Sequence, residues 1–249
     1  RMMPVAQLRS GRFNPRKDFA EHDLAELADT AAEHGAWLHV DAAYGGFFAL
    51  TVRGRAALAG IERADSVTLD PHKTLFLPYG TGALLVREPQ RVASLFAATA
   101  EYLPPRADED VEPAELGFEL TRPFRGLRVW LPLRLHGTAV FTRLLDEKLD
   151  LAHRLHAELA AMQHVEVVAA PQLSTLAFAA RRHAGEALDD VNARSVALLE
   201  HVNRTRRVLV TGTVLRGRFV IRPSIVSFRT HAEQVGLLAE LVRSGAVSG

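Results

Sequence analysis

Two residues of opposite charge, Asp41 and Lys73, each follow a short apolar segment that is typical of a strand. Asp41 closes the run "WLHV", and Lys73 comes just after "SVTL", in the stretch "DPHKTLFLPYGTG". In open α/β sheets, ligands bind beyond the carboxyl ends of the strands. We therefore expect both charges to face one crevice. Taken alone, Lys73 is more typical of a solvated surface charge. Asp41 alone is more typical of an aspartate that caps a helix or turn.

Such a pair of charges meets the needs of pyridoxal phosphate (PLP) chemistry. A lysine amine forms a Schiff base with this cofactor, and a carboxylate keeps the pyridine nitrogen protonated so that the ring accepts electrons. Lys73 and Asp41 could supply these two groups. Ala42 and Ala43 follow Asp41, and their small side chains would let a flat ring approach the strand end. Thr81, which stands between two glycines, could reach a phosphate.

The elements that must position these residues alternate between helices and strands. Leu24, Leu27, Ala28 and Ala31 recur at helical spacing, and Gly35 can end that helix. Short apolar runs at 37–40, 65–70 and 82–88 predict strands, with a brief helical segment at 57–64 between the first two. Helices alternating with short, doubly buried strands indicate an α/β layer.

The second half of the chain predicts a smaller α+β domain. Residues 126–162 form a long helical region, with interruptions expected at Pro132 and Gly137. Strands at 165–170 and 173–180, a helix at 188–204, a hairpin at 208–224 with its turn near Arg216 and Gly217, and a helix at 231–245 follow. We expect a partial large domain over 1–135, with an exposed loop near 97–117, and a linking helix with the small domain over 136–249.

Composition excludes several classes of function. The chain of 249 residues has 30 basic and 29 acidic residues, so no global field favours nucleic acid or an anionic membrane. It has no cysteine, and no apolar run reaches the length of a membrane helix. His153 and His156 lie three apart on a helix without further ligands, so we expect no metal site. These features predict a cytoplasmic protein that acts on small molecules.

Three motifs together carry a family resemblance. "WLHVDAAYGG", "ADSVTLDPHK" and "RGLRVWLPLRLHG" resemble the group II PLP-dependent amino-acid decarboxylases, which include aromatic amino-acid and glutamate decarboxylases. The resemblance runs from about Leu24 to the end of the chain. It implies the latter part of a fold-type I large domain, similar to aspartate aminotransferase, followed by a small α+β C-terminal domain. It also implies a homodimer that binds PLP and converts an L-amino acid to the amine and carbon dioxide.

The resemblance assigns roles to four residues around the cofactor. Lys73 would form the Schiff base, and Asp41 would pair with the pyridinium nitrogen. Ala43 would lie against the ring, and His72 would sit near the phosphate.

Two further residues would act on the substrate. Tyr102, on the loop "AEYLPP", matches the family's tyrosine that helps protonate the carbanion after carbon dioxide departs. Proton delivery to Cα gives the amine, whereas delivery to the cofactor carbon gives an aldehyde. Arg222 in "FVIRPS" matches the arginine that binds the substrate carboxylate, a task suited to a bidentate guanidinium. The alternatives are a tyrosine that only packs the loop and a solvated strand arginine.

The sequence also departs from the family pattern. A loop that cradles the phosphate and a histidine that stacks on the ring, both expected before Leu24, have no match here, and Thr74 stands where animal members often have tryptophan. The chain therefore resembles the latter half of the cofactor domain plus the small domain. Two alternative functions remain open: an aminotransferase or another carbon–carbon lyase, and an inactive fragment that serves as a dimerisation module.

Overall fold

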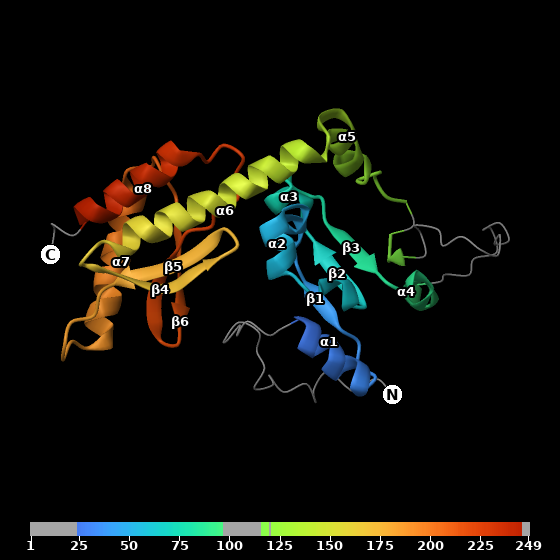
Figure 1. Ribbon diagram of the computed structural model, residues 1–249, viewed down its shortest axis with the longest axis horizontal. Coiled ribbons are helices and arrows are strands. Elements are labelled where there is room, and N and C mark those ends of the chain that lie inside the picture. The colour runs from blue at the N-terminus through green and yellow to red at the C-terminus, as the bar shows by residue number, and fades with distance from the viewer. Residues whose placement is uncertain (1–23, 97–115, 120, 246–249) are drawn as a thin grey trace. The chain divides into compact units, whose positions relative to one another are not determined.

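The computed structural model describes residues 24–96, 116–119 and 121–245 of the chain (Figure 1). Contacts divide the chain into two units, each built from separate segments. The first unit takes Arg1–Asp41, Leu58–Thr68 and Leu84–Arg122, and the second takes Ala42–Ala57, Leu69–Ala83 and Pro123–Gly249. The predicted boundary between residues 135 and 136 lies within the long helical region instead, and it stays a prediction.

Most of a three-stranded sheet belongs to the first unit. Its strand order is β1 (His39–Asp41), β2 (Ser66–Leu69) and β3 (Ala83–Val86). Strands β1 and β2 run parallel, as the α/β prediction requires, and Asp41 pairs in register with Thr68. The helices of this unit are α1 (Leu24–Glu33), η3 (Ile61–Arg63) and α4 (Pro89–Phe96).

The strands of this sheet are less buried than the sequence predicts. Leu84 and Leu85 of β3 are each 57% exposed, and helix α1 contributes only Ala28 to the buried residues. The prediction of doubly buried strands is therefore wrong for the described residues, because too few helices cover the sheet there. Trp37, before β1, is fixed by its indole N–H, which donates to Ser66 Oγ at 2.8 Å.

The second unit begins with short helical segments that follow the strand ends. These are η2 (Gly46–Leu50), α2 (Val52–Ala57) and α3 (Pro71–Thr74). Phe48 of η2 is fully buried against Leu145 and Leu149 of α6 (Thr138–Ala160). Gly54 of α2 lies so close to η2 that a Cβ there would stand 2.0 Å from the Phe48 carbonyl oxygen. Only glycine fits this contact, so α2 and η2 pack backbone to backbone.

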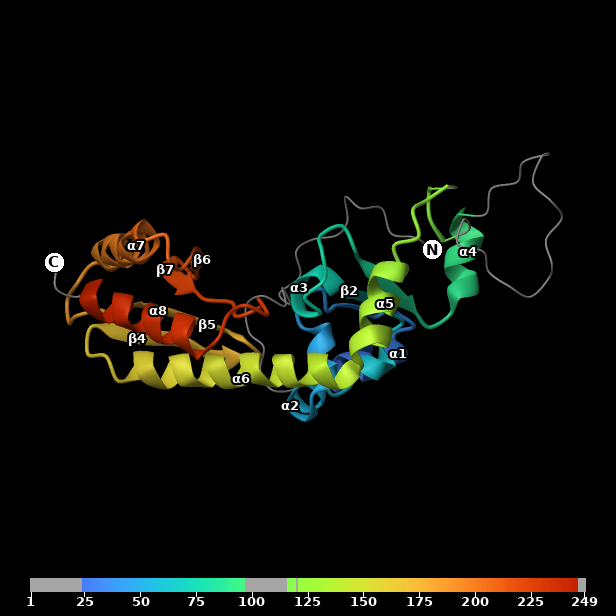
Figure 2. The ribbon, with the colours of Figure 1, turned by 90° about the horizontal axis from the view of Figure 1, so that it is seen from above.

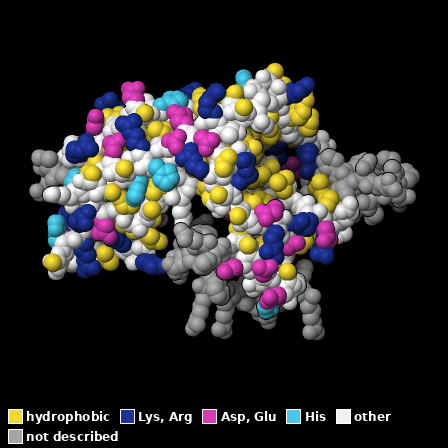
Figure 3. All heavy atoms as spheres, viewed as in Figure 1, with side chains coloured by type: hydrophobic (Ala, Val, Ile, Leu, Met, Phe, Trp, Pro, Cys, Tyr) yellow, Lys and Arg dark blue, Asp and Glu magenta, His cyan; other side chains and the backbone are white. Residues whose placement is uncertain are grey.

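Helix α5 (Leu127–His136) precedes α6, and Gly137, with φ 73°, separates the two as predicted. Pro132 lies inside α5 and does not interrupt it, so that part of the prediction is wrong. Because proline has no N–H, Pro132 cannot bond to the carbonyl oxygen of Arg128. The helix is exposed around Arg128, so water can donate to that oxygen instead. Trp130 and Leu135 of α5 are 58% and 69% exposed, and hydrophobic side chains gather at the surface over this helix (Figure 3).

An antiparallel four-stranded sheet forms the centre of the second unit. Its order is β4 (Val165–Gln172), β5 (Thr175–Ala180), β7 (Arg218–Arg222) and β6 (Thr211–Leu215). The two-residue turn between β6 and β7 is Arg216 and Gly217, both with positive φ, as the hairpin pattern predicts.

Helices α6, α7 (Leu188–Arg204) and α8 (Ala232–Ser244) cover one face of this sheet (Figures 1 and 2). Their apolar faces meet Val165, Phe178 and Ile221 of the strands in one buried core. The predicted helices at 188–204 and 231–245 are confirmed, because their apolar residues recur at the spacing that this core requires.

A buried lysine links α6 to the start of α8. Lys148 is fully buried, and its ammonium group donates to Glu147 Oε2 at 2.8 Å and to the Thr230 carbonyl at 2.6 Å. The other carboxylate oxygen of Glu147 lies 2.7 Å from His231 Nδ1. This buried charge is paired on both sides, which is the usual condition for a lysine inside a protein.

Candidate functional site

Asp41 is the last residue of β1 and is exposed. It belongs to the first unit, whereas the other described candidates, Ala43, His72, Lys73 and Arg222, belong to the second. The position of Asp41 at a strand end agrees with the sequence prediction, since the short parallel strand pair stops at this point.

Lys73 lies on α3, a single helical turn that follows β2. Pro71 occupies the first turn of this helix, where its missing N–H costs nothing. Asp70 does not cap the helix with its side chain; instead, its Oδ2 accepts from Lys73 Nζ at 2.7 Å. The Lys73 side chain is 43% exposed, whereas that of Lys148 is fully buried. Among the residues that the structure describes, Lys73 is thus the lysine whose amine a small molecule can reach.

His72 faces the turn before β3. Its Nδ1 lies 2.8 Å from the Thr81 carbonyl oxygen, which can only accept, so Nδ1 must carry a proton. Its Nε2 lies 3.9 Å from Asp70 Oδ2, a loose contact. His72 can therefore donate to an anion through Nε2 only when the ring is protonated.

Thr81 offers a second polar group at the same turn. The residue is 2% exposed, and its hydroxyl oxygen has no hydrogen-bond partner within the described ranges. Gly80 before it has φ 85°, and a Cβ on Gly82 after it would lie 3.6 Å from Asp70 Oδ1. A buried hydroxyl without a partner is unfavourable unless a ligand supplies one. The Thr81 hydroxyl can thus donate to an acceptor such as a phosphate oxygen, and the reachable Lys73 amine can react with an aldehyde.

Ala43 is partly buried, and its carbonyl accepts from the Asp70 N–H at 3.2 Å. This bond ties the segment after β1 to the segment that carries His72 and Lys73. The small Ala43 side chain is therefore held close to the lysine segment.

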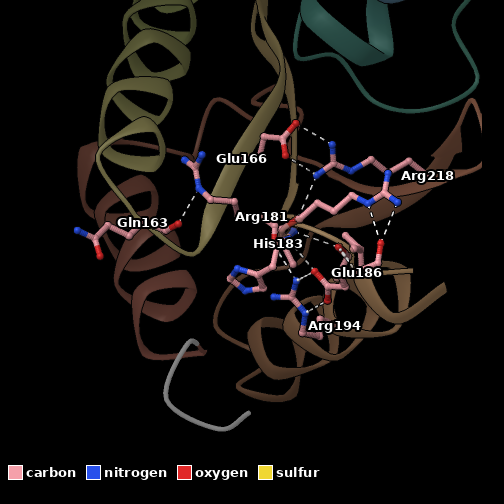
Figure 4. A network of polar contacts seen from close by, with 11 residues as sticks. Gln163, Glu166, Arg181, His183, Glu186, Arg194 and Arg218 are labelled. Carbon is pink, nitrogen blue, oxygen red and sulfur yellow. Dashed lines mark hydrogen bonds and ion pairs between the residues drawn. The ribbon is translucent and has the colours of Figure 1, made fainter. Parts of the chain in front are cut away.

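Arg222 ends β7 and is exposed. Arg218 on the same strand makes a bidentate ion pair with Glu166 at 2.7 and 2.9 Å, part of a network that joins β4, β5, β7 and α7 (Figure 4). Within the described part of the chain, no carboxylate pairs with the Arg222 guanidinium, so this side chain has its donors available for an anion. Of the two β7 arginines, Arg218 pairs with a carboxylate of the described residues and Arg222 does not.

Tyr102 lies outside the described residues, so its predicted role stays a prediction. Sequence reasoning missed Asp70 as the partner of Lys73, although an acid three residues before a lysine on a helical turn is a recognisable signal. It also missed Tyr44, whose hydroxyl lies 2.8 Å from Ser174 Oγ. No local pattern could have found that bond, because the two residues are 130 positions apart.

The described residues form neither a metal site nor a membrane-spanning helix. No group of three or more metal-ligating side chains, including those near His153 and His156, converges in the described residues. None of the helices described is long and apolar enough to span a membrane.

The chain is similar to known proteins. The sequence profile of the pyridoxal-dependent decarboxylase conserved domain matches residues 19–181. The chain is 34% identical over 219 residues to an aromatic-L-amino-acid decarboxylase of Bacillus atrophaeus, covering 87% of this chain and 46% of that protein. It is 32% identical to a histidine decarboxylase of Drosophila melanogaster, covering 86% of this chain and 24% of that one.

A solved structure shows the same fold. The crystal structure of Oryza sativa TDC with PLP and tryptamine superposes with a TM-score of 0.84 at 28% identity, covering 93% of this chain and 48% of that one. The predicted fold class, an α/β cofactor domain followed by a small α+β domain, is confirmed by this likeness. The chain spans about half the length of such relatives, or less.

Proposed function

The chain belongs to the pyridoxal-dependent decarboxylase family, and we propose that it carries out PLP-dependent decarboxylation of an L-amino acid to the amine and carbon dioxide. The observation that carries this proposal is Lys73: a reachable amine, directly after His72, at the end of a strand of the sheet. A homodimeric state, implied by the family resemblance, and a cytoplasmic location, predicted from the sequence, are part of the same proposal.

The bound cofactor would supply an electron sink for the bond that breaks. The Lys73 amine would hold it through its aldehyde carbon, and Asp41 would hold the proton on the pyridine nitrogen. Thr81 would donate to its phosphate, and His72 would sit near that phosphate. Ala43 would leave room for the ring. The missing partner of the Thr81 hydroxyl supports this assignment, because a phosphate oxygen would supply the acceptor.

The substrate would be held by its carboxylate and protonated after carbon dioxide leaves. Arg222 would bind the carboxylate, which the absence of a carboxylate partner among the described residues supports. Tyr102 would help protonate Cα, which gives the amine. The substrate's side chain is left open, since the relatives include aromatic amino-acid and histidine decarboxylases.

Trapping of the cofactor tests the role of Lys73 directly. The chain has lysines at positions 17, 73 and 148. Purified protein mixed with PLP and reduced with borohydride should carry the cofactor's mass on the peptide that contains Lys73. Lys73→Ala should abolish this label, and Lys17→Arg should leave it unchanged. Labelling that survives in Lys73→Ala contradicts the assignment.

Product analysis separates decarboxylation from the alternatives. Aromatic and acidic amino acids and histidine are offered to the PLP-treated protein, and carbon dioxide and amine are measured. Equal amounts of the two products support decarboxylation. Consumption of a keto acid without carbon dioxide would instead indicate an aminotransferase. A stable oligomer with neither trapping nor turnover would indicate a dimerisation module.

A further inference from the structure

Tyr44 bonds in two directions from the turn after β1. Its carbonyl oxygen accepts from Thr74 Oγ1 at 2.8 Å, and Thr74 directly follows Lys73. Its phenol oxygen lies 2.8 Å from Ser174 Oγ and accepts from the Ser174 backbone N–H at 3.0 Å. One residue thus contacts both the lysine segment and the turn between β4 and β5.

These bonds are shielded from water. Thr74 and Ser174 are both fully buried. Burial raises the pKa of the Tyr44 phenol, against the hydrogen bonds with Ser174 and Thr175 and the positive charge of Arg222, so the phenol stays neutral. A neutral phenol can donate one hydrogen bond and accept others, as the geometry around Ser174 requires. Loss of the phenol oxygen would leave the Ser174 N–H buried without a partner.

The turn that contains Ser174 also forms hydrogen bonds with the segment that follows Arg222. The Ser174 carbonyl accepts from the Ile225 N–H at 2.9 Å, and Thr175 Oγ1 lies 2.9 Å from Ser224 Oγ. The positive charge of Arg222 also acts to lower the pKa of the Tyr44 phenol. A continuous set of bonds therefore runs from the neighbour of Lys73, through Tyr44 and Ser174, to the chain that leaves Arg222.

We propose that Tyr44 is a positioning residue that sets the Arg222 guanidinium at a fixed distance from the Lys73 amine. An α-amino acid presents an amine and a carboxylate separated by one carbon, so a site that binds both groups needs two fixed points. Tyr44 joins the segments that carry those points. This inference rests on the proposed function, in which the cofactor held by Lys73 takes the substrate amine and Arg222 takes the carboxylate.

The test compares amino acids with the amines that they yield. Only the acid has a carboxylate for Arg222, so Tyr44→Phe should raise the KM of the acid while leaving the inhibition constant of the amine unchanged. We expect the ratio of the two constants to shift by about tenfold, the scale of one lost buried hydrogen bond. The probes are tryptophan with tryptamine, tyrosine with tyramine, and histidine with histamine. The kcat should change less than KM.

Two further variants distinguish positioning from stability. Ser174→Ala removes the same side-chain bond from the other side and should shift the ratio in the same direction, and it serves if Tyr44→Phe does not fold. Ser195→Ala is the matched control: Ser195 is equally buried, and its hydroxyl bonds to the Ala180 N–H and the Val191 carbonyl, away from the candidate site. It should lower the melting temperature without changing the ratio.

The outcomes separate this inference from the proposed function. Borohydride trapping at Lys73 should be as strong in Tyr44→Phe as in the wild type. If trapping and turnover persist and the acid-to-amine ratio is unchanged in Tyr44→Phe and Ser174→Ala, the positioning role is wrong and the proposed function stands. If the ratio moves equally in Ser195→Ala, the effect is general loosening and the positioning role is again wrong. A wild type that neither traps PLP nor turns over any probe overturns both.

Discussion

At the scale of single residues, the ion pair between Lys73 and Asp70 has a chemical consequence. Lys73 Nζ lies 2.7 Å from Asp70 Oδ2. An amine that attacks an aldehyde must first leave this carboxylate, so the pair holds Lys73 in a resting position. Because the lysine side chain is 43% exposed, water screens the pair and its strength is modest.

We expect Asp70→Asn to speed the reaction of Lys73 with PLP. The amide keeps the shape of the carboxylate but loses its charge, and a pair worth at most about 1 kcal/mol corresponds to about a fivefold gain in rate. Stopped-flow absorbance measures the rate. Asp146→Asn is the control, since Asp146, on α6, is a carboxylate that pairs with Arg53 of α2. A slower reaction in Asp70→Asn would show that the carboxylate assists the attack.

The candidate residues differ in how far the sequence predicts them. Asp41 and Lys73 are predictable because each comes after an apolar run that forms a strand. In open α/β sheets, ligands bind beyond the carboxyl ends of the strands. Tyr44 is predictable as part of its motif but not in its contact, because Ser174 comes from a turn far along the chain. Contacts of this kind depend on how the elements pack, and no local spacing encodes them.

At the scale of elements, the contact between α2 and η2 reverses an ordinary rule. Alanine normally favours a helix over glycine by about 1 kcal/mol. At Gly54, however, a Cβ would stand 2.0 Å from the Phe48 carbonyl oxygen, a backbone atom that cannot turn aside. The helix would have to move away from its neighbour.

We therefore expect Gly54→Ala to lower the melting temperature. Gly236→Ala on α8 is the matched control, because a Cβ there meets only Arg154 Nη2, at an ordinary 3.8 Å. That substitution should stabilise the protein by up to about 1 kcal/mol, by helix propensity alone. Thermal unfolding followed by circular dichroism measures both. Equal shifts in the two variants would show that α2 does not need the close contact.

Helices and strands were predictable from the sequence where one face of the element packs against a hydrophobic core. The helices at 188–204 and 231–245 repeat apolar residues at helical spacing because one face of each packs on the four-stranded sheet. Burial of the first sheet was not predictable in this way. Apolar residues such as Leu84 and Leu85 indicate that a strand is able to be buried. They do not indicate whether other elements cover that strand, and both of these side chains are exposed.

At the scale of the whole molecule, the carboxylates of Glu166 and Glu147 make the free energy of unfolding depend on pH in the acidic range. The hydrogen bond from Arg218 holds the pKa of Glu166 below its ordinary value, against the effect of burial. For Glu147, burial acts to raise the pKa, but the bonds from His231 and Lys148 outweigh it and hold the pKa low. A carboxylate with a lowered folded-state pKa stabilises the protein above its unfolded pKa and loses this contribution as pH falls through the folded value.

We therefore expect the melting temperature to fall as pH drops below about 4.5, through the range where these carboxylates take up protons. Glu166→Gln should lower the melting temperature at neutral pH and flatten its fall in acid. Glu240→Gln is the control and should follow the wild-type curve, because Glu240 of α8 is exposed and pairs with no basic side chain among the described residues. An unchanged slope in Glu166→Gln would mean that its pair with Arg218 contributes nothing to acid sensitivity.

The two tryptophans offer a way to observe the two units independently. The chain has two of these residues. Trp37, with its indole bonded to Ser66, belongs to the first unit, and the exposed Trp130 of α5 belongs to the second. Each unit therefore carries its own intrinsic fluorophore. Emission from Trp130→Phe and Trp37→Phe proteins, followed through a denaturant gradient, would show whether the halves of the chain open in one step or in sequence.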